Sequence, residues 1–397
     1  MINPENNLMV PAGMRDLLPP EAGRKRRLVN TILEKMALWG YEEISTPLLE
    51  YYHVLTKGET GAGPDQLYKL IERDGSILAL RPEVTTSIAR VVGGKMTGVP
   101  PWRLMYGCDV FRYEAVQAGR QRQFTQAGAE LIGQDGPEAD SEVLALAVEA
   151  LRASGLTDFT ISLGHMGILS GLLSGLSLEE RTLDEARGLI LEKDFAGLHH
   201  FLERAGLPGE KSDSLVDMLT RSFAPADLDG LLARAPACLQ PVFAELGSIA
   251  GLLDAYGCSS FVQVDLSTLR SQAYYTGMVF EIYTPGIGYP IGGGGRYNRL
   301  LRRFGRDCPA TGFALGVERL LLSLPGGEEN EAPVLLAAGS EKESDRRRLL
   351  EKARELRSQG CPVILELRAL KRGEAERMAR EKGAKLIRWA GGRNDGI

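Results

Sequence analysis

Residues 101–133 read PWRLMYGCDVFRYEAVQAGRQRQFTQAGAELIG and predict two strands joined by a polar loop rich in Gly and Gln. Arg112, Arg120 and Arg122 flank this loop, and a guanidinium group suits bidentate contact with phosphate. Gln126 and Glu130 are four apart on the second strand, so their side chains share one face and would offer acceptors to an imidazole. The competing interpretation is a solvated hairpin, which does not account for this density of Arg, Gln and Glu within strands.

The preceding segment, ILALRPEVTTSIARVV (77–92), predicts a strand that runs into a helix. Glu83 and Thr85 are two residues apart, so in an extended backbone they face the same side. Together they would hold an ammonium group by charge-assisted hydrogen bonds. The alternative is a helix start, with Thr85 or Thr86 as the N-cap and Glu83 near the positive helix end.

Both kinds of element are expected on either side of these segments. Helical spacing covers residues 21–38 and 141–155, whereas 41–51 and 157–165 alternate like strands. Residues of roughly 168–257 are rich in Leu, Ala, Glu and Arg at helical spacing. They predict a helical insertion that serves mostly as packing scaffold.

Strand patterns then return and carry three further groups of residues. Arg270, Tyr274 and Tyr275 precede a strand and would line a small polar pocket, although a tyrosine pair more often serves packing. Gly292–Gly295 would allow the backbone to approach a ligand or bend sharply, but they match neither the phosphate-binding loop nor the dinucleotide fingerprint. Arg319 opens a helix where it would reach a triphosphate.

Length and local charge indicate the domain organisation. The 397 residues predict a main domain over 1–325, a linker over 326–331 and a small α/β domain over 332–397. From Glu341 onward, 16 Lys and Arg stand against 10 Asp and Glu. Solvated helix faces explain such an excess, and contact with RNA is the alternative. Trp389 is the only aromatic residue in this part, so stacking on bases is not expected.

Composition excludes several classes of protein. A net charge of −5 does not indicate a polyanion-binding protein. The five cysteines are scattered, with no CxxC pair and no close histidine, so reduced thiols and no metal site are expected. No apolar run reaches membrane-spanning length, and the first residues lack a signal-peptide pattern. A cytoplasmic location is therefore expected.

In this order, the motifs resemble those of histidyl-tRNA synthetases and their paralogues, the regulatory subunits of ATP phosphoribosyltransferase. The similarity extends over roughly residues 9–325. PAGMRDLLP resembles the family's start, FRYE with the GRQRQF loop its second class II motif, and GFALGVERLL its third. RSQAYYTGMVFE and GGGGRYNRLL resemble segments of the histidine branch. The resemblance implies an α+β fold, a class II aminoacyl-tRNA-synthetase-like antiparallel sheet of six strands with flanking helices, usually in a homodimer.

The resemblance also implies a histidine pocket, formed by Glu83, Thr85, Arg112, Gln126, Glu130, Arg270, Tyr274 and Tyr275. Arg112 and Arg319 would correspond to the arginines that hold ATP phosphates in the synthetases, and Arg270 to one that assists adenylate formation.

Two departures place catalysis in doubt. Ser271-Gln272-Ala273 stand where the synthetases typically read Gly-Leu-Asp, and residues 332–397 are shorter than an anticodon-binding domain. The ATP site would then be vestigial, and no catalytic residue is expected.

The implied role is that of a non-catalytic regulatory subunit. Its partner would be the short catalytic subunit of ATP phosphoribosyltransferase, which joins ATP to phosphoribosyl pyrophosphate in the first step of histidine biosynthesis. The resemblance implies a homodimer within a hetero-oligomer, and it implies neither a cofactor nor a nucleic-acid or membrane partner. L-histidine would be the allosteric ligand for feedback inhibition, in the pocket or at a subunit interface. The alternative is a histidyl-tRNA synthetase with a shortened C-terminal domain, and residual synthetase activity stays open.

Overall fold

The computed structural model describes residues 9–58, 63–114, 121–168, 171, 180–206, 209–235, 237–270, 272, 274–325, 332–390 and 393–394. The chain divides into two compact units, Met1–Pro325 and Gly326–Ile397. The linker expected over 326–331 lies outside the described residues, as do Arg120, Ser271 and Ala273.

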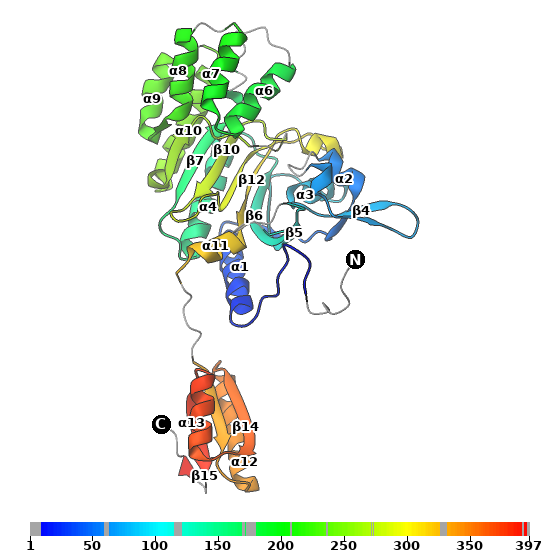
Figure 1. Cartoon of the computed structure of the whole chain (residues 1–397), viewed down its shortest axis with the longest axis vertical. Helices are drawn as coiled ribbons and strands as arrows, with labels where there is room; N and C mark the ends of the chain where they lie inside the picture. The colour runs from blue at the N-terminus through cyan, green and yellow to red at the C-terminus, as the bar shows by residue number, and fades with distance from the viewer. Residues whose placement is uncertain are drawn as a thin grey trace. The chain divides into compact units, whose positions relative to one another are not determined.

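A nine-stranded sheet forms the centre of the first unit, in the order β1-β5-β6-β12-β11-β10-β7-β9-β8 (Figure 1). The strands are β1 (Glu42–Glu43), β5 (Trp102–Phe111), β6 (Gln123–Ile132), β7 (Thr160–His165), β8 (Ser222–Phe223), β9 (Val262–Asp265), β10 (Met278–Tyr283), β11 (Gly292–Arg296) and β12 (Ala310–Gly316). The six from β5 to β7 are antiparallel neighbours, which confirms the expected fold class. The short strands β1, β9 and β8 extend the sheet at its edges. β1 pairs in parallel with β5, and β9 pairs in parallel with β7 and antiparallel with β8.

The predicted hairpin is the longest pairing in this sheet. β5 and β6 run in register from Trp102 opposite Ile132 to Phe111 opposite Gln123. Alternating residues of both strands enter two different hydrophobic clusters, such as Met105 in one and Leu104 in the other. The sheet is therefore covered on both faces, as the apolar content of these strands requires.

Helices cover the two faces of the sheet. On one face lie α1 (Glu21–Ala37), α4 (Pro137–Ala153) and α10 (Gln240–Ala255), and α4 packs against both of the others. On the other face lies α3 (Thr85–Gly94), beside the 3-10 turn Leu301–Phe304. α11 (Val317–Ser323) follows β12 directly. A small separate sheet has the strand order β2 (Leu49–Tyr51), β4 (Ile77–Leu80) and β3 (Lys69–Ile71). In the chain, α2 (Tyr52–Lys57) directly follows β2, and β4 precedes α3.

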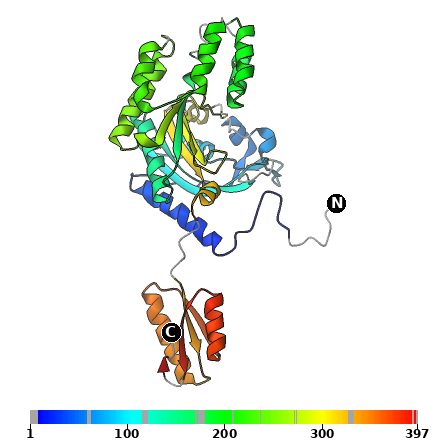
Figure 2. The same cartoon turned by 60° about the vertical axis from the view of Figure 1, so that its left-hand side comes forward.

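Between β7 and β9 the described part of the chain is mostly helical. It contains α6 (Glu180–Leu191), α7 (Phe195–Arg204), α8 (Gly209–Thr220), α9 (Leu228–Arg234) and α10. Figures 1 and 2 show these helices, in green, gathered at one end of the sheet. Two elements tie the insertion to the main body: β8 joins the sheet edge, and α10 packs on α4.

The second unit is a four-stranded sheet with helices on both faces. The strand order is β14 (Val363–Ala369), β13 (Val334–Ala338), β15 (Lys385–Ala390) and β16 (Arg393–Asn394). α12 (Glu343–Ser358) and α13 (Arg372–Glu381) bury separate clusters against alternate residues of β13. Within the described ranges of the whole chain, no helix is long and apolar enough to cross a membrane.

Candidate functional site

One cavity, called here the inner cavity, is lined by all eight residues expected to contact histidine. They come from the start of α3, the β5–β6 hairpin and the segment before β10, which are far apart in the sequence. The inner cavity is further lined by Tyr106, Gln272, Tyr297, Phe313, Ala314 and the glycines Gly293 and Gly312.

Glu130 lines this cavity and is only 1% exposed. Thr85 donates a hydrogen bond from Oγ1 to its Oε1 over 2.7 Å, and the Tyr297 hydroxyl donates to its Oε2. Burial raises the pKa of Glu130 to about 8, although the two hydroxyl contacts favour the ionised form. Near neutral pH this carboxyl group is therefore largely protonated.

The backbone opposite Glu130 has to be glycine. Gly312 pairs with Glu130 across β12 and β6. A Cβ atom at position 312 would lie 1.8 Å from Glu130 Oε2 and 2.6 Å from the carbonyl oxygen of Ala129. Glycine thus makes room for the buried carboxyl group.

Glu83 fits both interpretations that the sequence left open, although the N-cap of α3 is Val84 and not Thr85 or Thr86. Its carboxylate oxygens accept hydrogen bonds from the Thr86 backbone N–H, at 3.0 and 3.2 Å, at the start of α3. The same side chain is 6% exposed and lines the inner cavity. A carboxylate has more lone pairs than this one N–H uses, so it can stabilise the helix start and also accept from a ligand.

Tyrosines form much of the wall. The ring centroid of Tyr274 lies 4.8 Å from that of Tyr275 and 5.8 Å from that of Tyr297. Burial raises the pKa of all three hydroxyls above the usual value, so they remain neutral. The tyrosine pair therefore both packs and borders the cavity.

The three arginines expected at a nucleotide line a second, larger cavity of about 860 Å³, called here the outer basin. Arg112 and Arg270 border both cavities, whereas Arg319 borders only the outer one. Arg112 Nε donates to the Pro82 carbonyl over 2.8 Å. Arg270 is paired with Glu281 at 2.8 Å, and Arg319 donates to the Pro290 carbonyl over 2.5 Å.

The two cavities differ in free space. The inner cavity has a free volume of about 40 Å³, which is room for roughly one water molecule. The volume of the outer basin falls in the range of small-molecule pockets. An amino acid would therefore enter the inner cavity only when side chains in its wall move.

Tyr106, Gln272 and Tyr297 were not expected in the site. Tyr297 follows the four glycines after one intervening residue, Arg296, and this position directly after a strand was the available signal. Tyr106 of β5 lies on the strand next to Gln126 of β6. Whether its side chain points to the same side of the sheet as Gln126 depends on the register of β5 against β6, which the sequence does not give.

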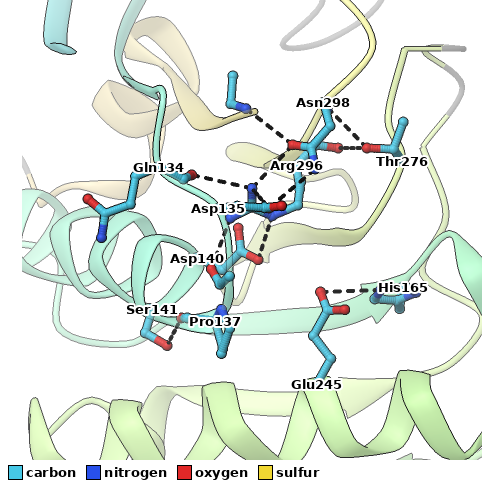
Figure 3. Close-up of polar contacts among 12 residues, drawn as sticks. Gln134, Asp135, Pro137, Asp140, Ser141, His165, Glu245, Thr276, Arg296 and Asn298 are labelled. Carbon is cyan, nitrogen blue, oxygen red and sulfur yellow. Dashed lines mark hydrogen bonds and ion pairs between the residues drawn. The ribbon is translucent and has the colours of Figure 1, made fainter. Parts of the chain in front are cut away.

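A buried ionic cluster fixes the end of β11 next to Tyr297 (Figure 3). Arg296 donates from Nε to Asp140 over 2.9 Å and from Nη1 to Asp135 over 2.7 Å. Arg296 is 4% exposed and Asp140 is fully buried. Because neighbouring residues of a strand point to opposite faces, this anchor holds the backbone from which Tyr297 turns towards the cavity.

Nearby, His165 at the end of β7 faces Glu245 of α10, with Nε2 3.4 Å from Oε1 (Figure 3). His165 lowers the pKa of Glu245. This contact adds a polar link between the helical insertion and the sheet.

Comparison with known proteins gives consistent matches. The family described as histidyl-tRNA synthetase matches residues 13–320. An ATP phosphoribosyltransferase regulatory subunit from Moorella thermoacetica is 42% identical over 97% of this chain and 98% of its own length. One from Desulfitobacterium hafniense is 38% identical over 98% of this chain and 99% of its own.

Solved structures agree with these relatives. One described as an ATP phosphoribosyltransferase regulatory subunit/histidyl-tRNA synthetase from Bacillus halodurans has a TM-score of 0.86 and 32% identity, covering 96% of this chain and 98% of that one. A histidyl-tRNA synthetase from Nostoc, at 24% identity and a TM-score of 0.80 over 96% of this chain and 91% of that one, shares the fold.

Proposed function

This chain belongs to the family of ATP phosphoribosyltransferase regulatory subunits, on a histidyl-tRNA-synthetase fold, and from that premise we propose that it activates a catalytic subunit and transmits feedback inhibition by histidine. Its place in histidine biosynthesis follows from the family. The partner would be the short catalytic subunit of ATP phosphoribosyltransferase, in a hetero-oligomer built on a homodimer of this chain.

The convergence of Glu83, Thr85 and Glu130 on the inner cavity is the observation that carries the histidine part of the proposal. Glu83 and Thr85 stand at one wall with acceptors for an α-ammonium group. Gln126 and Glu130 lie on the neighbouring strand β6 with groups that suit an imidazole N–H. Arg112 and Arg270 supply positive charge near a carboxylate. These groups complement every polar part of free histidine.

The small inner cavity supports a regulatory role for this binding. A ligand changes an equilibrium only by binding one state better than another. Since the cavity has room for roughly one water molecule, histidine would select a state in which the wall has opened. A catalytic partner that contacts the two states differently would then respond, with a coupling of about 1–3 kcal/mol typical of allosteric proteins.

A non-catalytic role agrees with how the arginines are held. Arg270 is ion-paired with Glu281, and Arg112 and Arg319 donate to backbone carbonyl groups. A synthetase would need these guanidinium groups directed to ATP during adenylate formation. The competing function is a histidyl-tRNA synthetase with a shortened C-terminal domain. The observation that favours it is that all three arginines line the outer basin.

The test measures ATP phosphoribosyltransferase activity of the short catalytic subunit, with and without this chain and with and without histidine. Activity should rise on mixing and fall when histidine is added. Glu83→Gln removes the charge that holds the ammonium group and should weaken histidine inhibition at least roughly tenfold, as expected for a lost charge-assisted hydrogen bond. Glu72→Gln, which changes an exposed glutamate in the turn after β3, should leave inhibition unchanged.

Three results would contradict the proposal in whole or in part. If the chain does not change the activity of the catalytic subunit, activation is wrong. If the pure chain instead supports histidine-dependent exchange between ATP and pyrophosphate, the synthetase function replaces it. Inhibition that is identical in Glu83→Gln and wild type would move the histidine site to a subunit interface.

A further inference from the structure

The helical insertion carries a second group of ligating side chains, which the pocket does not use. α7 carries His199, His200 and Glu203, and α8 carries Asp213. The two helices pack against each other (Figure 1). One potential ligand atom from each histidine and from Glu203 lie within 4.8 Å of one another. No cysteine takes part, so the cysteine spacing of the sequence gave no signal for it.

Helix geometry explains why these three side chains converge. Glu203 follows His199 by four residues and His200 by three, so it borders both on the surface of α7. Its Oε2 is 3.7 Å from Nδ1 of His199 and 3.9 Å from Nδ1 of His200. In a tetrahedral zinc site with bonds of about 2.0–2.1 Å, ligand atoms stand roughly 3.3 Å apart. Rotations at the ends of partly exposed side chains can provide the difference.

Asp213 determines which nitrogen of His199 is available to bind. Its Oδ1 lies 2.8 Å from Nε2 of the ring. An ionised carboxylate only accepts hydrogen bonds, so Nε2 carries the proton and donates it. In the neutral ring, Nδ1 then has a lone pair facing the carboxylate of Glu203. Two electron pairs that face each other repel, and a cation between them, either a second proton on the ring or a metal ion, would stabilise this arrangement.

We propose that His199, His200 and Glu203 bind a divalent transition-metal ion, for which Zn²⁺ is the best match, and that Asp213 orients His199. Two imidazoles and one carboxylate suit zinc, whereas Mg²⁺ and Ca²⁺ favour oxygen ligands alone. A carboxylate on the far nitrogen of a metal-bound histidine is the usual arrangement in such sites. Three protein ligands leave a fourth position for water or for a donor from another molecule.

The bound ion would also connect two helices of the insertion. Its ligands all come from α7, and Asp213 of α8 holds one of them in place. Zinc should therefore reduce local opening of α7 and α8.

The test titrates Zn²⁺ into the full chain by calorimetry at slightly alkaline pH, after metal has been removed with a chelator. We expect saturable binding of one zinc ion per chain. His199→Ala and Glu203→Gln should each weaken it at least roughly tenfold. Asp213→Ala should weaken it by roughly 10–100-fold, as for other groups that orient a ligand, and Asp213→Asn, which keeps an acceptor, should recover part of the loss.

Two control variants separate this site from other zinc-binding groups. His53→Ala removes an exposed histidine on α2, and Cys238→Ser removes an exposed thiol; both should bind zinc like wild type. As a second measurement, zinc should slow hydrogen exchange of α7 and α8 amides in the wild type but not in His199→Ala. The proposal is overturned if wild type shows no saturable binding, if His199→Ala binds as tightly, or if Cys238→Ser abolishes binding.

Discussion

At the scale of single residues, Glu130 has the most unusual environment in the site. It is buried beside two hydroxyl donors, and with a pKa of about 8 its carboxyl group retains a proton near neutral pH. In the unfolded chain the same carboxyl would titrate near 4.3. The folded chain therefore retains one more proton than the unfolded chain at intermediate pH.

This difference predicts how stability depends on pH. Below about pH 4 the carboxyl is protonated in both states. As pH rises towards 8, folding requires the chain to retain a proton that the unfolded chain releases, so stability falls by up to about 1.4 kcal/mol per pH unit. Glu130→Gln removes this dependence. Urea unfolding of wild type and variant between about pH 4 and pH 8 should give free energies of unfolding that diverge as pH rises. Parallel curves of free energy against pH would contradict the assigned pKa.

At the scale of elements, the glycines of β11 and β12 determine how closely the central strands approach. Gly294 and Gly312 lie where a Cβ would fall within 2.0 Å of another backbone or side-chain oxygen. Of these two, Gly312 lines the inner cavity, as does Gly293 of β11, so part of the cavity wall, called here the floor, is backbone without side chains.

Gly312→Ala should disrupt this floor. The added methyl group overlaps Glu130 Oε2 and the Ala129 carbonyl, so we expect a loss of about 1–3 kcal/mol in stability, as for an overpacked core, and loss of measurable histidine binding. Gly247→Ala is the matched control, because that glycine lies in α10 and a Cβ there meets nothing within 4 Å. Thermal melts and histidine titration of both variants test this prediction.

The Arg296 cluster offers an internal comparison of buried and exposed ion pairs. Asp140→Ala removes the buried partner and should cost about 3–5 kcal/mol of stability, since the arginine remains without it. Asp135→Ala removes a partner that is 66% exposed and should cost no more than about 1 kcal/mol. Denaturant unfolding of the two variants measures both losses. Equal losses would mean that the buried pair does not anchor the end of β11.

At the scale of the whole molecule, the inner cavity draws all its residues from the unit Met1–Pro325. A fragment of residues 1–325 should therefore fold and bind histidine with the affinity of the full chain. Circular dichroism and calorimetry of the fragment test this. Weaker binding by the fragment would show that Gly326–Ile397 stabilises the site from a distance.

The sequence predicted most of this arrangement wherever periodicity was informative. The helix expected over 21–38 is α1, and Gln126 and Glu130 line one cavity from one strand, as their spacing required. The family resemblance assigned Tyr274 and Tyr275 to the histidine pocket. Their spacing alone would have assigned them to packing. Two-residue strands such as β8 have no period, so the attachment of the insertion to the sheet edge was not predictable.

Other features depend on contacts between distant segments. The hydrogen bond from Tyr297 to Glu130 needs the register of β11, β12 and β6, which no local pattern contains. Arg319 was expected near a nucleotide and borders only the outer basin, because α11 begins at the end of β12 rather than beside Glu130. The group of His199 and Asp213 appears only once α7 and α8 are packed together.

The small free volume of the inner cavity has a consequence in time. A molecule as large as an amino acid has to wait for the wall to open before it can enter a space that holds roughly one water molecule. The association rate constant for histidine should then lie well below the diffusional ceiling of roughly 10⁸–10⁹ M⁻¹s⁻¹ for small molecules. In stopped-flow mixing, the observed rate should level off at high histidine, at the frequency with which the cavity opens. A catalytic partner controlled in this way would respond to the histidine concentration averaged over many openings of the cavity. Fluctuations in histidine concentration shorter than this time would not change its activity.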